Sequence, residues 1–229
     1  MNKRELTLFA GLSAAVMAAG FANVAHADKL ADVLARGKLI VGTGSTNPPW
    51  HFRDEAGNLA GFDIDVAKIV AKGLFDDPEK VEFVIQASDA RVPNVVTDKV
   101  DITCQFMTVT AARAQLVNFT IPYYREGVGL LLTKDGKYKS HDEMKAAGSA
   151  VTVSVLQNPD KYLDSGYGWN PQTYACAVKR GEADWLNFVN TALHEAMTGV
   201  EFGTYSASFQ KWFGEAPPAP KIGFPSELN

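Results

Sequence analysis

The sequence predicts an α/β protein, and three observations lead to this fold class. Short runs rich in Val, Ile and Phe recur along the chain, and segments with an apolar residue at every third or fourth position separate them. Of the 229 residues, 46% are hydrophobic and 21% are charged, as in an ordinary folded protein. This composition excludes collagen-like, disordered and polytopic membrane proteins. We therefore expect strands and helices to alternate around a sheet.

The first 27 residues have the features of a secretory signal. Lys3 and Arg4 form a charged start, and residues 8–19 are uncharged and apolar. In the Ala25-His26-Ala27 segment, the two alanines are the small residues at the specificity positions of a signal peptidase site. The alternative is a membrane anchor, but the apolar run is shorter than the roughly 20 residues that span a bilayer. We expect cleavage after Ala27 into the periplasm or medium, without a stable membrane anchor, since no cysteine near the cleavage site could carry a lipid.

Strands and helices alternate clearly in the first half of the mature chain. The expected strands are residues 38–43, 81–85 and 100–106. Between the first two, the apolar spacing of residues 66–74 predicts a helix whose end is marked by Gly73 and Pro78. Such an order is typical of a sheet covered by helices.

The second half is less regular. Strands are expected at residues 127–133, 151–156 and 173–179, a helix around residues 140–147, and two more helices over 185–197, ended by Gly199, and 205–213. Residues 158–172 show no sustained period and carry several glycines and prolines, although they join two strands where a crossover helix would be expected. The tail from Glu215 contains four prolines and is expected to run over the surface.

Charge and cysteine content narrow the class of partner and the compartment. The 22 basic and 26 acidic residues give a net charge of −4, so no basic surface for nucleic acid is expected. Cys104 and Cys176 remain in the mature chain, and an exported protein meets oxidising conditions in which the two could form a disulfide. Both lie in apolar, strand-like runs, so two buried thiols are the alternative.

The chain lacks the sequence signatures of most enzymes. It has no Gly-rich phosphate loop, no His/Cys cluster at metal spacing and no G-x-S-x-G motif. The four histidines, His26, His51, His141 and His194, are scattered without the near neighbours that a metal site or a triad needs. We therefore expect no metal, no cofactor and no catalytic residue.

The run from Thr108 to Arg113 predicts an anion site. Thr110 is a suitable N-cap, which places Arg113 in the first turn of a helix, where a cation makes sense if an anion is bound at the same helix end. A carboxylate held by Arg113 and Thr108 is the natural candidate, and a surface arginine paired with a nearby acid is the alternative. Arg91 supplies a second cation, which would suit a ligand with two carboxylates.

Several motifs, in their order along the chain, resemble the periplasmic amino-acid-binding proteins of ABC importers, solute-binding protein family 3. The matching segments are residues 48–50 (PPW), 61–67 (GFDIDVA), 91–93 (RVP), 99–102 (KVDI), 107–113 (MTVTAAR) and 118–124 (NFTIPYY). The resemblance continues through the expected strand and helices from Tyr174 to Phe213.

The resemblance implies a periplasmic-binding-protein-like fold of type II, a clamp of two lobes. Lobe 1 would comprise residues 28–126 and 173–229, and the chain would cross the hinge near residues 124–130 and return near Tyr174. The positions of Thr108 and Arg113 would hold the α-carboxylate of the ligand. Positions that would line the same cleft are Asn47, Ser88, Gln105 and Phe106, with unusual residues at 47 and 106, whereas Trp50 and Phe62 are expected to pack the lobe.

Two details resemble the glutamate/aspartate-binding branch of this family. Arg91 stands where that branch uses an arginine for the ligand side chain, and Cys104 with Cys176 matches its bridged strand pair. The resemblance thus favours a Cys104–Cys176 disulfide and an acidic or polar amino acid as the ligand.

The chain also departs from the family pattern. The family continues after the strand that matches residues 151–156 with further helices and strands of the second lobe, whereas here the Asn-Pro segment follows directly. Several tens of residues are absent, and with them the acidic partner of the ligand's α-ammonium group. The second lobe is reduced to residues 127–172, so we expect a loosely ordered or docked lobe 2 and weakened ligand binding.

The main hypothesis is thus the monomeric, periplasmic substrate-binding component of an amino-acid importer, whose partners are a small-molecule amino acid and a membrane permease. An enzyme of the same fold, dehydratase-like, is an alternative that needs a general acid or base in the cleft. A non-transport interaction protein that retains lobe 1 is the other.

Overall fold

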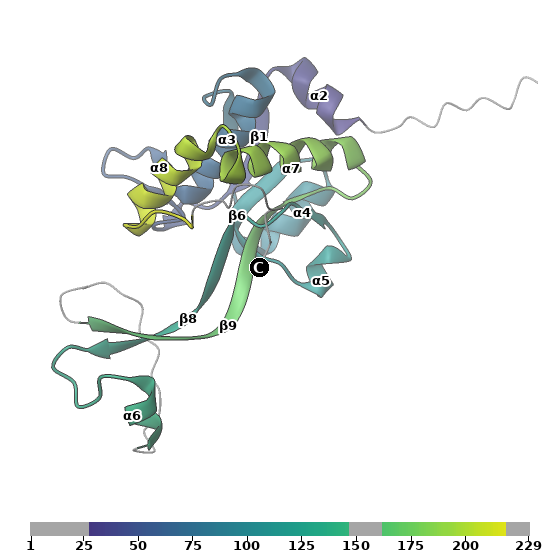
Figure 1. The fold of residues 1–229 in the computed structure, drawn as a ribbon. Helices are drawn as coiled ribbons and strands as arrows, with labels where there is room; N and C mark the ends of the chain where they lie inside the picture. The colour runs from purple at the N-terminus through teal and green to yellow at the C-terminus, as the bar shows by residue number, and fades with distance from the viewer. Residues whose placement is uncertain (1–27, 147–161, 219–229) are drawn as a thin grey trace, which may run out of the picture.

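The computed structural model describes residues 28–146 and 162–218, which form a main lobe and a long two-stranded ribbon that projects from it (Figure 1). The α/β class predicted from the sequence is confirmed. The lobe is built from two separate parts of the chain, because the ribbon leaves the lobe after Tyr123 and returns to it near Tyr174.

The main sheet has the strand order β5-β1-β6-β9-β7, and β8 pairs with β9. Strands β5 and β6 both run parallel to β1, whereas β9 is antiparallel to β6, β7 and β8. The strand bounds are β1 Leu39–Thr43, β5 Val81–Ile85, β6 Ile102–Thr108, β7 Asn118–Phe119, β8 Tyr124–Thr133 and β9 Tyr162–Val178. Because β1, β5 and β6 are parallel, their carboxyl ends meet at one edge of the sheet.

Helices cover both faces of this sheet. Alternate residues of β1 point to opposite sides, so that Val41 joins the larger apolar core under α3, α7 and α8, and Ile40 packs against the smaller core that includes α4. The helix bounds are α2 Lys29–Arg36, α3 Phe62–Phe75, α4 Arg91–Val96, α5 Ala111–Ala114, α6 His141–Ala146, α7 Ala183–Thr198 and α8 Phe202–Phe213. Gly199 follows α7 as predicted.

The helix predicted to end near Gly73 continues to Phe75, and its left-handed cap is Asp76. Gly73 is used for packing instead: a β-carbon at this position would lie 3.3 Å from Ala192 of α7. The close approach of two helices therefore explains this glycine, which had been expected to act as a stop signal.

A small antiparallel sheet beside the main one was not predicted. It contains β2 Thr46–Asn47, β3 His51–Arg53 and β4 Leu59–Ala60. Gly61 leads from it into α3 with a φ of +127°, and a β-carbon there would lie 2.3 Å from the Trp50 carbonyl oxygen. A glycine is therefore required at this turn.

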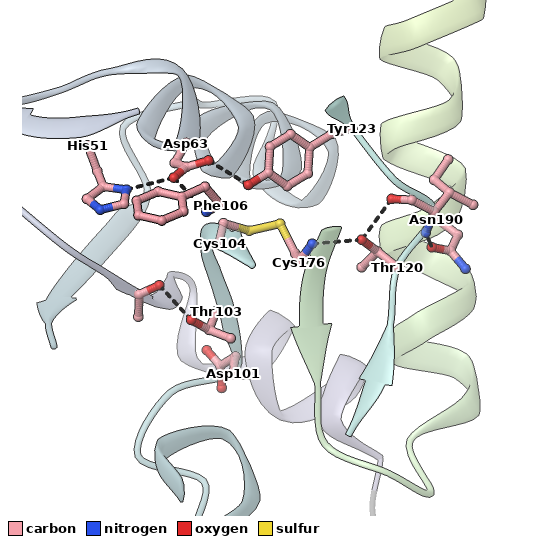
Figure 2. The surroundings of a disulfide bond; sticks show 12 residues. His51, Asp63, Asp101, Thr103, Cys104, Phe106, Thr120, Tyr123, Cys176 and Asn190 are labelled. Atoms are coloured by element: carbon pink, nitrogen blue, oxygen red, sulfur yellow. Dashed lines mark hydrogen bonds and ion pairs between the residues drawn. A yellow bond between two sulfur atoms is a disulfide. The ribbon is translucent and has the colours of Figure 1, made fainter. Parts of the chain in front are cut away.

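Cys104 of β6 and Cys176 of β9 form a disulfide between neighbouring strands, with an S–S distance of 2.04 Å and a Cα–Cα distance of 4.4 Å (Figure 2). Both cysteines are buried in the larger core. The bond joins the two separate parts of the main lobe across 72 positions of the sequence.

The ribbon corrects one sequence-based expectation. Strand β9 begins at Tyr162, within the segment 158–172 that was expected to be irregular, and pairs with β8 from Thr133–Tyr162 to Tyr124–Tyr174. Hydrogen bonds between the two backbones impose extended structure on a sequence whose local propensity opposes it. The pairing shifts register twice, and Pro171 lies within one of these shifts, between Trp169 and Gln172. The strand expected at residues 151–156 lies outside the described residues.

None of the helices in the described parts of the chain is long and apolar enough to cross a membrane.

The disulfide is expected to contribute substantially to stability. Replacing both cysteines by alanine (C104A/C176A) should lower the free energy of unfolding by about 2–4 kcal/mol, because the bond closes a long loop in the unfolded chain. Urea denaturation with and without a reductant measures the effect. The reductant should shift the wild-type curve toward that of the variant and leave the variant unchanged; a wild-type curve that the reductant does not move would contradict this prediction.

Candidate functional site

The predicted site residues lie on the loops and strand ends at the shared edge of the parallel strands. Asn47 is in β2 after the end of β1, Ser88 lies in a short 3-10 helix after β5, and Gln105 is near the end of β6. The carboxyl edge of parallel strands is where α/β proteins commonly bind ligands. The fold thus brings together residues that are distant in the sequence.

A cavity of about 290 Å³ opens at this edge, and Asn47, Ser88 and Gln105 are among the residues that line it. A larger hollow of about 460 Å³ lies between α3 and α8, but none of the predicted site residues lines it. Two of its lysines, Lys68 and Lys72, are already paired with glutamates. The chemistry therefore favours the smaller cavity as the candidate site.

Arg91 is a buried cation that forms no ion pair among the described residues, although the charge of Asp63 lies close enough to act on it. Its side chain donates to the Ser88 hydroxyl and lies over the Phe106 ring, 5.2 Å from the ring centroid, and the residue is 6% exposed. The Nε atom of Arg91 is buried and has no hydrogen-bond partner among the described residues. Burial, and then the charge of nearby Arg113, lower the pKa of the Arg91 guanidinium below its usual value.

Arg113 is the second cation at this edge, and the Thr108 carbonyl oxygen orients it by accepting a hydrogen bond from its Nη1 at 2.8 Å. As predicted, Thr110 caps the short helix α5 and accepts a hydrogen bond from the Arg113 backbone N–H. Helix α5 has four residues, so its dipole adds little, and the guanidinium itself must supply the attraction for an anion.

Within the described residues, no carboxylate forms an ion pair with Arg91 or Arg113. The alternative interpretation of Arg113, a surface arginine paired with a nearby acid, therefore finds no support there. Two neighbouring cations that are partly removed from water and form no direct ion pair favour the binding of an anion beside them.

Phe106 is held in a conformation that large side chains rarely adopt. Its φ is +33°, and it lies where the pairing of β6 with β9 shifts register between Thr103 and Met107. Backbone strain of this kind costs about 1–3 kcal/mol and is found at functional sites. One face of its ring stacks on His51, with 4.6 Å between the ring centroids and 4° between the planes.

The structure corrects the prediction that no histidine has a near partner. His51 is fully buried, and its Nδ1 lies 2.7 Å from Oδ2 of the buried Asp63 (Figure 2). Asp63 also accepts hydrogen bonds from the Tyr123 hydroxyl and from the Phe106 backbone N–H. His51 Nε2 lies 3.3 Å from Nδ2 of Asn47, and these partners assign the proton to Nδ1.

Burial raises the pKa of Asp63 above its ordinary value, although the hydrogen bonds with His51, Tyr123 and Phe106 act in the opposite direction. Burial, reinforced by the charge of Asp63, raises the pKa of Tyr123 well above its usual value. No signal in the sequence indicated this cluster, since its members lie on separate elements.

A second buried polar network fixes Gln105, which is 2% exposed. Gln105 accepts a hydrogen bond from Gln86, whose side chain in turn contacts Thr103 and Asn94. Gln86 and Asn94 were not predicted as site residues, although polar residues next to predicted strands could have indicated them. This network fixes the orientation of the Gln86 and Gln105 side chains at the wall of the cavity.

Trp50 and Phe62 pack the lobe, as predicted. Phe62 is fully buried in the larger core. The Trp50 ring contacts Tyr124 and Tyr174 at centroid distances of 4.7 and 5.2 Å, where the ribbon meets the lobe. These aromatic contacts tie the base of the ribbon to the site.

Comparison with known proteins gives a consistent result. Residues 39–215 match the family described as bacterial extracellular solute-binding proteins, family 3. A glutamine-binding protein of Geobacillus stearothermophilus is 32% identical over 182 residues, which cover 74% of this chain and 67% of the relative. The L-cystine-binding protein TcyJ of Escherichia coli (strain K12) is 26% identical over 259 residues, with coverages of 89% and 94%.

Solved structures of an arginine-binding protein show the same fold. A mutant of ArgBP from T. maritima has a TM-score of 0.62 and 25% identity, and the match covers 82% of this chain and all of that one. An arginine-bound form of domain 1 from TmArgBP, a mutant chain, has a TM-score of 0.50 and 27% identity, with coverages of 73% and 98%.

The floor of the site should tolerate no added atom at Gly44. A β-carbon there would lie 2.5 Å from Cδ2 of His51 and 2.6 Å from its Nε2. Replacing Gly44 by alanine should therefore lower the free energy of unfolding by about 1–3 kcal/mol through overpacking. Thermal denaturation checks this, with Gly203→Ala in α8 as the control, because that position is open and should lose no stability. Equal melting of Gly44→Ala and the wild type would contradict the prediction.

Proposed function

Because the chain belongs to the bacterial extracellular solute-binding proteins, family 3, we propose that it is the periplasmic substrate-binding component of an ABC amino-acid import system. The observation that carries the proposal is the pair of neighbouring cations at the ligand edge of the sheet, Arg91 and Arg113, neither of which forms an ion pair within the described residues. The partner of such a component is a membrane permease. We expect the mature chain, cleaved after Ala27, to act as a monomer.

We propose that Arg113 binds the α-carboxylate of the amino acid. Its guanidinium is half-buried and is oriented by the Thr108 carbonyl oxygen. A planar guanidinium can donate two parallel hydrogen bonds to a carboxylate, and the Thr108 hydroxyl can add a third. Asn47 and Gln105, which line the adjacent cavity, complete the proposed site.

Arg91 is the proposed partner of the ligand side chain. Its unpaired Nε and its contact with Ser88 leave hydrogen-bonding capacity for a second carboxylate, and Phe106 supports its guanidinium. The relatives named above are described as binding glutamine, L-cystine and arginine, so the preference for an acidic amino acid rests on Arg91 itself.

We further propose that lobe 1 comprises residues 28–126 and 173–229, and that the second lobe is shortened to residues 127–172. The alignment with TcyJ is 259 positions long, whereas this chain has 229 residues, 89% of which are aligned. Part of TcyJ therefore lies opposite gaps in this chain, which supports an internal loss. The solved domain 1 from TmArgBP is an arginine-bound form, which supports ligand binding by a first lobe alone. Without the second lobe's acidic group for the α-ammonium, affinity should be low.

An enzyme of the same fold is the second candidate. The His51–Asp63 pair is the group that favours it, since a histidine oriented by a carboxylate is a common general base. Both side chains are fully buried, however, and His51 is covered by Phe106. A base that cannot reach a ligand cannot transfer its proton, so binding without turnover is the better-supported function.

Calorimetric titration of the mature chain (residues 28–229) with glutamate, aspartate and glutamine tests the proposed function. We expect binding weaker than micromolar for the acidic amino acids, and a loss of at least about tenfold in affinity for Arg113→Met, because a hydrogen bond to a charged group is worth about 1.5–3 kcal/mol. Lys68→Met, which removes a remote cation, is the matched control. Micromolar affinity would contradict the shortened lobe, and unchanged affinity of Arg113→Met would contradict the proposed carboxylate site.

Arg91→Met should change ligand preference. We expect its affinity for glutamate to fall at least about tenfold more than its affinity for glutamine, because only glutamate places a second negative charge beside Arg91. Competition titrations at constant ionic strength give the ratio of the two affinities, again with Lys68→Met as the control. An unchanged ratio would show that Arg91 does not contact the ligand side chain.

A further inference from the structure

We propose that Asp63 is a positioning residue for the ligand site. Its carboxylate holds the backbone of Phe106 at positive φ, and the Phe106 ring in turn holds Arg91 in place. This role rests on the proposed function and deepens it, and part of its test needs no ligand.

Asp63 lies at the start of α3 and is fully buried. Its Oδ2 accepts hydrogen bonds from Nδ1 of His51 at 2.7 Å and from the Phe106 N–H at 2.9 Å, and its Oδ1 accepts one from the Tyr123 hydroxyl at 2.6 Å (Figure 2). Three donors from three different parts of the lobe thus converge on one carboxylate. The negative charge of Asp63 is also favourable in the first turn of α3, a helix of 14 residues, because the helix dipole is positive at that end.

The hydrogen bond to Phe106 replaces one that the sheet does not supply. Pairing of β6 with β9 is regular at Thr103 and again at Met107, and Phe106 lies in the irregular stretch between them. A backbone N–H in such a position needs another acceptor, and Asp63 provides it. Without that acceptor, nothing in the local sequence favours a phenylalanine at a φ of +33°.

The position of the ring determines the position of the cation. The Phe106 ring stacks on His51, which Asp63 also orients, and the Arg91 guanidinium lies 5.2 Å from the ring centroid. Apart from the ring, Arg91 is held through the Ser88 hydroxyl and attracted by the charge of Asp63, and its Nε has no hydrogen-bond partner in the described part of the chain. Movement of the ring should therefore release Arg91.

Asp65 provides a matched control on the same helix. Its Oδ2 accepts hydrogen bonds from the Ser208 hydroxyl at 2.6 Å and from Nε1 of Trp212 at 2.7 Å, which tie α3 to α8. Asp63→Asn and Asp65→Asn each alter a partly or fully buried carboxylate with several donors. Only the first of these carboxylates contacts the elements of the ligand site.

The binding test is a double-mutant cycle with Phe106→Gly, because glycine adopts positive φ without assistance. Affinity for glutamate is measured by NMR titration, which reaches millimolar dissociation constants. We expect Asp63→Asn to weaken binding about tenfold in the wild type and less than twofold in the Phe106→Gly background. Asp65→Asn should have less than a twofold effect in both backgrounds. Equal losses in the two backgrounds for Asp63→Asn would overturn the proposal, because Asp63 would then act through overall stability or through its own charge on Arg91, and not through Phe106.

The ligand-free test follows the Arg91 Nε–H and Phe106 amide resonances. We expect Asp63→Asn to shift both, and Asp65→Asn to shift neither; unmoved resonances in Asp63→Asn would overturn the proposal. If Asp63→Asn does not fold, Asp63→Glu takes its place, since the longer carboxylate changes the distance to Phe106 and keeps the charge. If no amino acid binds the wild type, the proposed function fails, and the resonance shifts still decide the role of Asp63.

Discussion

The antiparallel pairing of β6 with β9 is the interaction on which the rest of the structure depends. It joins the segment before the ribbon to the segment after it in one sheet, and the Cys104–Cys176 disulfide lies within it. Helices α7 and α8, which follow β9, then cover the same face as α3 and close the larger core. If these strands did not pair, the two parts of the lobe would be separate fragments.

The same pairing also shapes the candidate site. Side chains alternate along β6, so that Cys104 belongs to the larger core and Met107, three residues later, to the smaller one. Phe106 lies on the same side of β6 as Cys104, packs partly against the larger core, and has the Arg91 guanidinium over its ring. The irregular stretch leaves the Phe106 N–H to Asp63 and holds the backbone at a φ of +33°, and in this conformation the ring lies against His51 and Arg91.

Much of the fold could be predicted from the sequence, because its signals are local. The run of β-branched and aromatic residues predicted both ends of β5 correctly. Capping residues predicted the start of α5 at Thr110 and the end of α7 at Gly199. The failures concern contacts between distant segments. The first part of β9 is extended because β8 pairs with it, and the partnership of His51 with Asp63 depends on how β3 packs against α3. Such contacts between distant segments leave no periodic pattern in the sequence of either segment, so they could not be predicted from it.

The ribbon also has a consequence for solubility. Within the described residues, β8 pairs with β9 alone, and its outer edge presents unpaired N–H and C=O groups. Natural proteins cover, charge or shorten such edges, because an open strand edge accepts a strand from another molecule. A two-stranded ribbon is itself only marginally stable in water. Whatever covers the outer edge of β8 therefore decides whether the chain remains dispersed at high concentration, independently of any ligand.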